Sequence, residues 1–254
     1  MKLYILGGTG NSGQRLVRMA LNRSYQVTAF VRDREKLVSK FGGITSSGLN
    51  IITGAIDDSR ALAAGMSGHD AVINAAGNVN DGLSFTQLVR TAIGAAAEAL
   101  GAGGRLWLFG GAAVLDVPGE RFMTLDLPKI PPIYESHRTN LKAVQATKLD
   151  WSMLCPGPMI DAPDGKPTEN LRLSEDEWPV ERPAFTYFLP RLALSVAFKQ
   201  KMSEMTISYE DAAKVILDHL APNGRFSRKR VGVALPIGLK RHKRFTPGER
   251  RLPN

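Results

Sequence analysis

The chain begins MKLYILGGTGNSG (residues 1–13), and this stretch decides the fold. Residues 3–6 indicate a buried strand, and residues 12–21 place apolar side chains at helical spacing. Glycines between a strand and a helix permit a tight turn and let a ligand approach the backbone closely. The free N–H groups at the start of the helix attract phosphate. The stretch therefore predicts a diphosphate-binding loop, whose residues are Gly7, Thr9, Gly10, Asn11, Ser12 and Gly13.

Strand and helix patterns alternate through the first 155 residues. Further strands are predicted at residues 26–31, 51–53, 71–74, 105–109 and 151–155, and helices between them at 58–66, 83–100 and 135–147. Such alternation predicts parallel β-α-β units with right-handed crossovers, and apolar strands predict a sheet that is covered on both faces. We therefore expect an α/β fold, a Rossmann-type doubly wound parallel sheet with a small C-terminal cap region.

Prolines interrupt the pattern after residue 156. Helices are still predicted at residues 192–201 and 208–220, the second with Ser208 as its N-cap and Asp211 at its third position. We expect an NAD(P)-binding Rossmann core at 1–160. A cap region at 161–224, integrated with the core, is expected over the carboxyl ends of the strands, where ligands bind in open α/β sheets.

The positive charge is concentrated near the C-terminus. The net charge is +9, and residues 225–254 hold ten lysines and arginines against one acid, Glu249, so the rest of the chain is balanced. This distribution predicts a basic tail at 225–254 rather than a nucleic-acid surface on the core. A basic tail can contact an acidic partner, RNA or another subunit, or lie solvated on the body. The apolar residues 231–237 within it fit an edge strand.

The number and spacing of cysteines, histidines and serines argue against disulfides, metal sites and serine nucleophiles. Cys155 is the single cysteine, so no internal disulfide can form. The four histidines are scattered, and no spacing typical of metal ligands or of a Gly-x-Ser-x-Gly elbow is present. We therefore expect no metal site. The first apolar run is too short for a signal peptide or a membrane span, so we expect a cytoplasmic protein.

The end of the second predicted strand bears on the cofactor. It reads Phe30-Val31-Arg32-Asp33-Arg34. An arginine at this place accommodates the 2′-phosphate of NADP, whereas an acid binds the ribose 2′-hydroxyl of NAD. Arg32 comes first, and its guanidinium suits phosphate by charge and fork geometry. We therefore expect NADP(H) as the preferred cofactor, with NAD(H), held through Asp33, as the alternative.

Several segments together resemble the atypical short-chain dehydrogenase/reductases, in the branch of NAD(P)H-binding and NADH-flavin reductase proteins that includes biliverdin reductase B. These segments are residues 7–13, 31–33, 70–77, 105–111 and 149–157. The resemblance covers about residues 1–165 and is specific for the superfamily, not for a substrate.

The resemblance implies positions for the remainder of the cofactor. Ala75, Ala76 and Gly77 would pass its ribose. Gly110, with Gly111, would lie near the nicotinamide, and Pro156 would shape the nicotinamide pocket. Family members often have an aspartate that binds adenine where this chain has Ala55, so Ile56 would serve the adenine through its backbone and apolar contacts, unless Asp57 shifts into that position.

The catalytic residues of the typical dehydrogenases are missing. Residues 110–113 carry no serine. Tyr134 and Arg138 have the spacing of the Tyr-x-x-x-Lys pair, but counting back from Leu149 places His137 in the lysine position and Ile133 in the tyrosine position. A histidine also falls there in biliverdin reductase B-like proteins. His137 and Tyr134 are therefore the candidate catalytic residues, and both also fit a structural role.

Without a tyrosine–lysine pair, reduction of a carbonyl lacks its proton donor, and general acid catalysis contributes roughly 10²–10⁴-fold. Planar acceptors need such help least. We therefore expect a reductase that transfers hydride from NADPH to a small-molecule acceptor such as a flavin, quinone or tetrapyrrole. The alternative is a non-catalytic NADP(H)-binding redox sensor or scaffold. A sugar epimerase or dehydratase is disfavoured because the tyrosine–lysine pair is absent.

Overall fold

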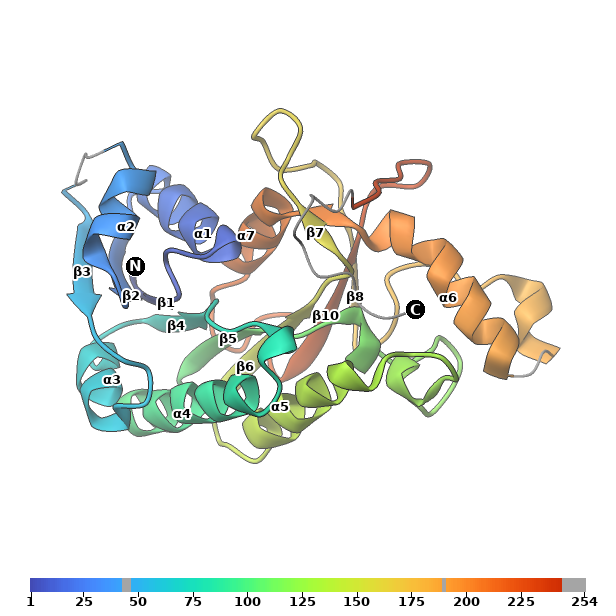
Figure 1. Ribbon diagram of the computed structural model, residues 1–254, viewed down its shortest axis with the longest axis horizontal. Coiled ribbons are helices and arrows are strands. Elements are labelled where there is room, and N and C mark those ends of the chain that lie inside the picture. The colour runs from blue at the N-terminus through green and yellow to red at the C-terminus, as the bar shows by residue number, and fades with distance from the viewer. Residues whose placement is uncertain (43–46, 189–190, 244–254) are drawn as a thin grey trace.

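A mostly parallel sheet lies between two layers of helices in the computed structural model, which describes residues 1–42, 47–188 and 191–243 (Figure 1). Within these residues the main sheet has eight strands in the order β3-β2-β1-β4-β5-β6-β10-β8. They are β1 (Lys2–Leu6), β2 (Gln26–Val31), β3 (Leu49–Thr53), β4 (Ala71–Asn74), β5 (Arg105–Phe109), β6 (Asp150–Cys155), β8 (Arg172–Glu175) and β10 (Lys229–Ala234). Neighbouring strands are parallel except β10 and β8. The predicted Rossmann-type fold is confirmed.

Helices cover both faces of the sheet (Figure 1). One face carries α1 (Asn11–Asn22), α2 (Arg34–Lys40) and α7 (Tyr209–Asp218), and the other carries α3 (Ser59–Met66), α4 (Leu83–Leu100) and α5 (Glu135–Gln145). The helix α6 (Arg191–Met205) extends away from the sheet beside the short 3-10 helix η5 (Ala184–Phe188). A separate parallel pair consists of β7 (Met159–Ile160) and β9 (Ile207–Ser208).

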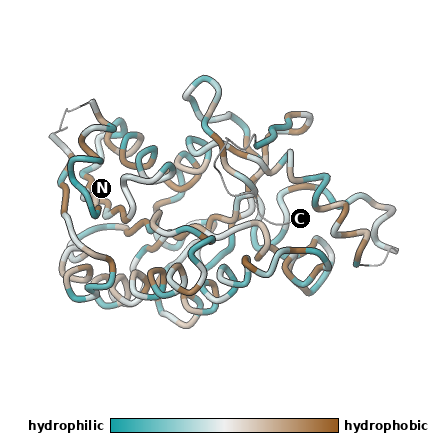
Figure 2. The backbone as a smooth tube through the Cα atoms, viewed as in Figure 1, coloured by the Kyte–Doolittle hydropathy of each residue, from teal (hydrophilic) through white to brown (hydrophobic). Residues whose placement is uncertain are grey.

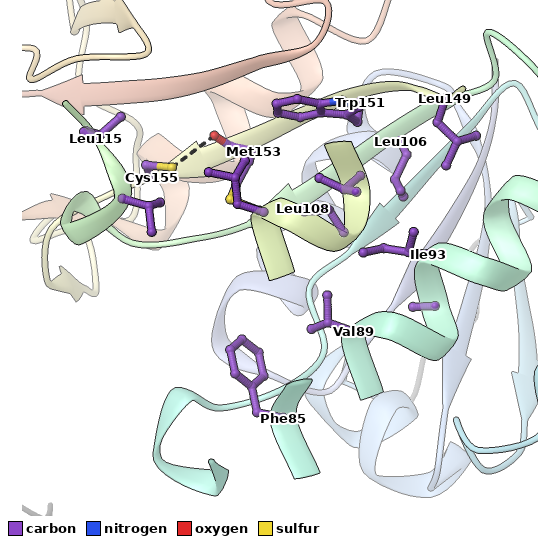
Figure 3. Close-up of a cluster of buried hydrophobic side chains, with 14 of the residues drawn as sticks. Phe85, Val89, Ile93, Leu106, Leu108, Leu115, Leu149, Trp151, Met153 and Cys155 are labelled. Atoms are coloured by element: carbon purple, nitrogen blue, oxygen red, sulfur yellow. Dashed lines mark hydrogen bonds between the residues drawn. The ribbon is translucent and has the colours of Figure 1, made fainter. Parts of the chain in front are cut away.

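Each face of the central strand β1 contributes to a different apolar core. Leu3 and Ile5 pack into the cluster beneath α1 and α7, whereas Tyr4 and Leu6 pack into the cluster beneath α3, α4 and α5, because successive side chains of a strand point to opposite faces. Figure 3 shows how Phe85 of α4 belongs to the second cluster, below the side chains of β5 and β6. Hydrophobic and hydrophilic bands alternate along the outer helices, as expected for helices that bury one side (Figure 2).

Helix α2 and strand β8 are among the elements that the sequence did not predict, as are β7, β9 and the short 3-10 helices. The short helix α2 begins after Asp33, whose side chain accepts a hydrogen bond from the backbone N–H of Lys36 and so caps the helix. The strand β8 pairs antiparallel with β10 at the edge of the sheet. The predicted N-cap at Ser208 is confirmed: Ser208 and Asp211 form a reciprocal capping box at the start of α7.

The prediction of a basic tail beginning at residue 225 is wrong for residues 225–243. Residues 229–234 form β10, which lies inside the sheet between β6 and β8 and is not an edge strand. The guanidinium of Arg230 binds both carboxylate oxygens of Asp116, at 2.7 and 3.0 Å, and also pairs with Asp176. Further ion pairs join Arg225 to Glu175, Lys229 to Asp176 and Arg241 to Asp211. These charges therefore hold the fold together.

Residues 244–254, on which the rest of the predicted tail falls, lie outside the described residues, so contact with an acidic partner, RNA or another subunit remains a prediction.

The region after residue 160 is tied to the first helix of the core. Arg15 of α1 pairs with Glu210 of α7 at 3.0 Å and with Asp161 at 2.5 Å. The side-chain amide of Asn11 donates to the hydroxyl of Tyr209 at 3.3 Å. The start of the first helix is thus held by residues of α7 and by Asp161, which follow their partners in α1 by 146 to 198 positions.

Candidate functional site

The glycine loop fits tightly between α1 and the end of β4. Gly7 has φ +79°, and a Cβ at this position would stand 2.7 Å from the backbone nitrogen of Ala76. At Gly13, a Cβ would overlap the carbonyl oxygen of Gly7 and stand 2.7 Å from the carbonyl carbon. Gly10 is the N-cap of α1 and contributes no side-chain cap. The first N–H groups of α1 are therefore presented without a capping side chain, as a phosphate requires.

A cleft of about 1280 Å³ opens at the carboxyl ends of β1, β2, β3 and β4. It brings together eight of the residues that were predicted to bind the cofactor: Gly7, Thr9, Gly10, Arg32, Ile56, Ala75, Ala76 and Gly77. The lining of this cleft does not include Asn11, Ser12, Gly13, Gly110, Pro156, Tyr134 or His137. The predicted residues thus fall into two groups. One lines the cleft at the ends of β1 to β4, and the other does not contribute to its lining.

The two charged candidates at the end of β2 are used differently. Arg32 is exposed and lines the cleft. Asp33 is not part of the lining, because its carboxylate caps α2 through a 2.9 Å hydrogen bond from the backbone of Lys36. The cleft therefore presents a cation at this end.

The turn after β4 is shaped by hydrogen bonding and by a glycine. The side-chain oxygen of Asn74, which is buried, accepts a 3.0 Å hydrogen bond from the backbone of Ala76. Gly77 has φ +109°, and a Cβ there would stand 2.6 Å from the ring of Phe85. This tight approach brings the backbone of residues 75–77 along the wall of the cleft.

A second group of predicted residues meets at the ends of β5 and β6. The backbone N–H of Gly110 donates to Leu154 at 2.7 Å, and that of Ala112 donates to Pro156 at 2.9 Å. A Cβ at Gly111 would stand 3.0 Å from both Nε2 and Cδ2 of His137. The fold thus places His137 of α5 beside Gly111 although the two are 26 positions apart in the sequence.

His137 is buried among aromatic rings. Its ring stacks on Tyr134, with centroids 6.2 Å apart and an angle of 12°, and meets Phe85 edge to face at 5.6 Å. Burial lowers the pKa of His137 to about 4. Within the described chain its Nδ1 is fully enclosed and has no hydrogen-bond partner. Burial also raises the pKa of Tyr134, so both side chains are neutral at pH 7.

The sequence interpretation missed the part of the cleft formed by α4 and its neighbours. Ala55 and Asp57, which were considered at the adenine position, also line the cleft, and the lining residues that were not anticipated are Phe30, Val31, Asn78, Asp81, Leu83, Ser84, Thr86, Gln87, Leu88, Arg90, Thr91 and Thr139. The signal for α4 was present, since a predicted helix follows the glycine turn at residue 77 after only a few residues. Thr139 belongs to α5, and only the packing of α5 against α4 brings it to the cleft.

Two kinds of feature are absent from the described residues. They contain no group of three His, Cys, Asp or Glu side chains that could hold a metal ion. They also contain no helix that is both long and apolar enough to cross a membrane.

Comparison with known proteins agrees with this geometry. A family model for NAD(P)H-binding proteins matches residues 7–182. The uncharacterized protein YwnB of Bacillus subtilis (strain 168) is 26% identical over 234 residues, which are 87% of this chain and 92% of YwnB.

Solved structures share the fold. A protein from Streptococcus pneumoniae TIGR4 that is described as an NADH-flavin reductase superposes with a TM-score of 0.68 at 22% identity, over 93% of this chain and 100% of the other. A protein from Bacteroides thetaiotaomicron described as an epimerase has a TM-score of 0.70 at 22% identity, over 95% and 99%. A short-chain dehydrogenase/reductase from Veillonella parvula DSM 2008, in complex with NADP, has a TM-score of 0.66 at 17% identity, over 93% and 95%.

The family match extends from the first glycine of the loop through the end of β8 and so includes both groups of candidate residues. It confirms the expected membership of an NAD(P)H-binding family and supports a nicotinamide dinucleotide as the cofactor. The chain belongs to the NAD(P)H-binding family.

Proposed function

We propose that the protein is a reductase that transfers hydride from NADPH to a planar acceptor such as a flavin, quinone or tetrapyrrole. One observation carries the choice of NADPH: at the end of β2 the cleft presents Arg32, while Asp33 is engaged as the cap of α2. Because Asp33 does not line the cleft, its carboxylate is poorly placed to bind a ribose hydroxyl there. An arginine matches a phosphate in charge and geometry.

The residues present fit a dinucleotide. The N–H groups at the start of α1, next to Gly10, would hold the diphosphate, and Arg32 would bind the 2′-phosphate. Ile56 would contact the adenine, and residues 75–77 would pass the ribose. Gly110 and Pro156 would border the nicotinamide. Bound NADPH supplies the hydride, and the chain supplies position and exclusion of water.

The proposed class of acceptor follows from acid residues that are missing at the ends of β5 and β6. The residues at the ends of β5 and β6 include no serine and no tyrosine–lysine pair, so a carbonyl that must be protonated as it is reduced receives no acid from the chain. A planar conjugated acceptor spreads the charge that it gains and needs that acid least. The similarity to a protein described as an NADH-flavin reductase supports this acceptor class.

A second function is favoured by a different observation. His137 and Tyr134 are neutral, buried and outside the lining of the cleft. A protein that binds NADP(H) without turnover, as a redox sensor or scaffold, needs no catalytic group there. An epimerase or dehydratase stays disfavoured, despite the similarity to a protein described as an epimerase, because the tyrosine–lysine pair is missing.

The cofactor preference is tested by calorimetry with NADPH and NADH on the wild type and on Arg32→Ala. A charge-assisted hydrogen bond contributes roughly 1.5–3 kcal/mol, so affinity for NADPH should fall by about 10- to 100-fold while affinity for NADH changes little. Arg34→Ala is the matched control, because Arg34 lies two residues away and its side chain bonds the carbonyl of Ile51 instead. An unchanged NADPH/NADH ratio in Arg32→Ala would contradict the assignment.

Turnover is tested by following NADPH oxidation with FMN, FAD, biliverdin and quinones. Oxidation with at least one of them supports the reductase. Tight NADPH binding with no oxidation across the set supports the non-catalytic binder, and failure to bind either dinucleotide would refute both.

A further inference from the structure

We propose that His137 acts as a neutral hydrogen-bond donor, which presents Nε2–H to the ligand at the carboxyl end of β5 and transfers no proton. This deepens the proposed reductase, on which it rests, because it restricts the acceptor to conjugated molecules whose hydride-reduced form is a stabilised anion.

The position of the ring is fixed from three sides. Phe85 of α4 meets the imidazole edge to face, and Tyr134 stacks on it almost in parallel. The edge that carries Nε2 and Cδ2 faces Gly111, since both atoms lie 3.0 Å from where a Cβ would stand. Any side chain at residue 111 would therefore displace the ring. The fold thus directs one particular nitrogen of His137 towards the end of β5.

The other nitrogen determines where the proton is. A neutral imidazole has one N–H donor and one acceptor nitrogen. The Nδ1 of His137 is fully enclosed and has no hydrogen-bond partner within the described chain. A buried N–H without a partner is the rarer and costlier arrangement, whereas an under-satisfied acceptor is better tolerated. The proton therefore resides on Nε2, the nitrogen that faces Gly111.

Burial keeps the ring neutral, and no ionised side chain touches it among the ring contacts of the described residues. Tyr134 is the titratable side chain that touches the ring, and burial raises its pKa, so it carries no charge near neutral pH. Phe85, from α4, is apolar. Glu135 and Arg138 flank His137 on α5 and pair with each other at 3.4 Å, and Asp81 lies on the short 3-10 helix η1 (Val79–Asp81), which packs near Tyr134. Burial correspondingly lowers the pKa of His137 to about 4.

A neutral His137 can stabilise the charge that the acceptor gains with the hydride, but it does not supply a proton. In the hydride step the C–H bond of the dihydronicotinamide breaks with its electron pair, and a new bond to hydrogen forms on the acceptor. The acceptor thereby gains one negative charge and the cofactor becomes NADP⁺. The Nε2–H of His137 stabilises an oxygen or nitrogen that shares this charge, as a neutral imidazole can. The proton that completes the reduced product comes from water.

Because His137 stabilises charge and water supplies the proton, the site distinguishes between classes of acceptor. Flavins and quinones delocalise the added charge over a conjugated system, so a hydrogen bond suffices and the protonation can follow in solvent. A simple ketone or aldehyde concentrates the charge on one alkoxide oxygen, which requires an acid within the site. We therefore expect turnover of quinones or flavins and none of isolated ketones.

The tautomer is directly measurable by NMR of protein labelled with ¹⁵N in its histidines. Two other histidines serve as internal controls. The Nδ1 of His69 lies 3.1 Å from the carbonyl of Met66, and the Nδ1 of His219 lies 2.8 Å from that of Val215. Because a carbonyl can only accept, both must carry the proton on Nδ1. His137, assigned by loss of its signals in His137→Gln, should show the opposite tautomer.

The expected result is an Nε2–H signal for His137 that does not titrate between about pH 5.5 and 8 and that shifts when NADP⁺ is added, while His69 and His219 stay unmoved. Three outcomes would overturn the proposal: an Nδ1–H tautomer; titration within that range; or NADP⁺ binding, proved by calorimetry, that leaves the His137 signal unchanged.

Activity gives the second readout. His137→Phe keeps the ring packing and removes the donor, so we expect kcat with a quinone or FMN to fall about 100-fold while the KM for NADPH changes little. His137→Gln restores an N–H group and should recover part of the loss. The wild-type kcat should be independent of pH across the same range. An unchanged kcat in His137→Phe would refute the donor role.

The two proposals fail in distinguishable ways. If the wild type binds NADPH but turns over no acceptor, the reductase fails, and the tautomer and its response to NADP⁺ still decide the state of His137. If turnover occurs and kcat follows a single group that titrates near pH 6–7, the reductase stands and the neutral donor fails.

Discussion

Replacement of Gly13 by alanine is the sharpest test of how the glycine loop is built. The new Cβ would overlap the carbonyl oxygen of Gly7 and stand 3.0 Å from the Cα of Gly8. The loop cannot move aside freely. The carbonyl of Gly7 accepts a 2.9 Å hydrogen bond from Gly10, and the far side of Gly7 is filled by the backbone of Ala75 and Ala76. The strain must therefore be absorbed by separating α1 from β1.

The expected cost follows from these contacts. Overpacking costs roughly 1–3 kcal/mol, and loss of the hydrogen bond from Gly10 to Gly7 costs roughly 0.5–1.5 kcal/mol. The better helix propensity of alanine returns about 0.8–1 kcal/mol. We expect the free energy of unfolding of Gly13→Ala to fall by about 0.5–3.7 kcal/mol, and affinity for NADPH to fall with it because the same amides are displaced.

Gly94→Ala is the matched control. Gly94 is also helical, lies in the middle of α4, is exposed, and has open space where its Cβ would go. The same substitution should there stabilise the protein by about 0.5–1 kcal/mol and leave NADPH binding unchanged. Urea unfolding followed by circular dichroism measures both variants. A Gly13→Ala protein as stable as the wild type would refute the reasoning.

Three further predictions concern charges and caps. Asp33→Ala should lower the free energy of unfolding by about 1 kcal/mol through loss of the α2 cap, without altering the NADPH/NADH ratio measured by calorimetry. Ser208→Ala should cost a similar amount by breaking the capping box of α7, as urea unfolding would show, whereas an unchanged midpoint would contradict it. For Asp176, burial acts to raise the pKa, but hydrogen bonds and charges from Lys229 and Arg230 outweigh it and hold the pKa below its usual value of 3.8. Its stabilising contribution is therefore present at neutral pH and is lost as the pH falls below about 4, so Asp176→Asn should be destabilised at pH 7 and converge with the wild type in acid unfolding curves.

The nucleotide-binding half of the fold could be predicted from the sequence because its signals are local. A strand, a glycine turn and a helix follow one another within residues 1–22, and each depends on near neighbours. The same holds for Ser208, whose cap partner Asp211 is three residues away.

The C-terminal strand could not be predicted in this way. Lys229 and Arg230 appear in the sequence as part of a basic run, which suggests solvent. Their partners Asp116 and Asp176 lie far away along the chain, and only the folded sheet brings the four charges together. Charge alone could not distinguish a solvated segment from a paired one.

The site was predictable in part for the same reason. Gly7, Arg32 and Gly77 come from segments with recognisable spacing and meet in one cleft. The contact between His137 and Gly111 depends on how α5 packs across the end of β5, which no local pattern encodes. The use of Asp33 as a helix cap was likewise hidden, because the short helix α2 was not predicted.

The strand order also dictates when the sheet can be completed during synthesis. Strand β8 precedes β10 in the chain, yet within the described sheet it pairs with β10 alone, and β10 in turn covers the edge of β6. When residues 1–200 have left the ribosome, β6 is therefore the last parallel strand of the sheet, and its edge away from β5 has no partner. The sheet is completed only when residues 229–234 are available, so a chain truncated before them would leave one edge of β6 without a partner strand and prone to aggregate, while its other edge stays paired with β5.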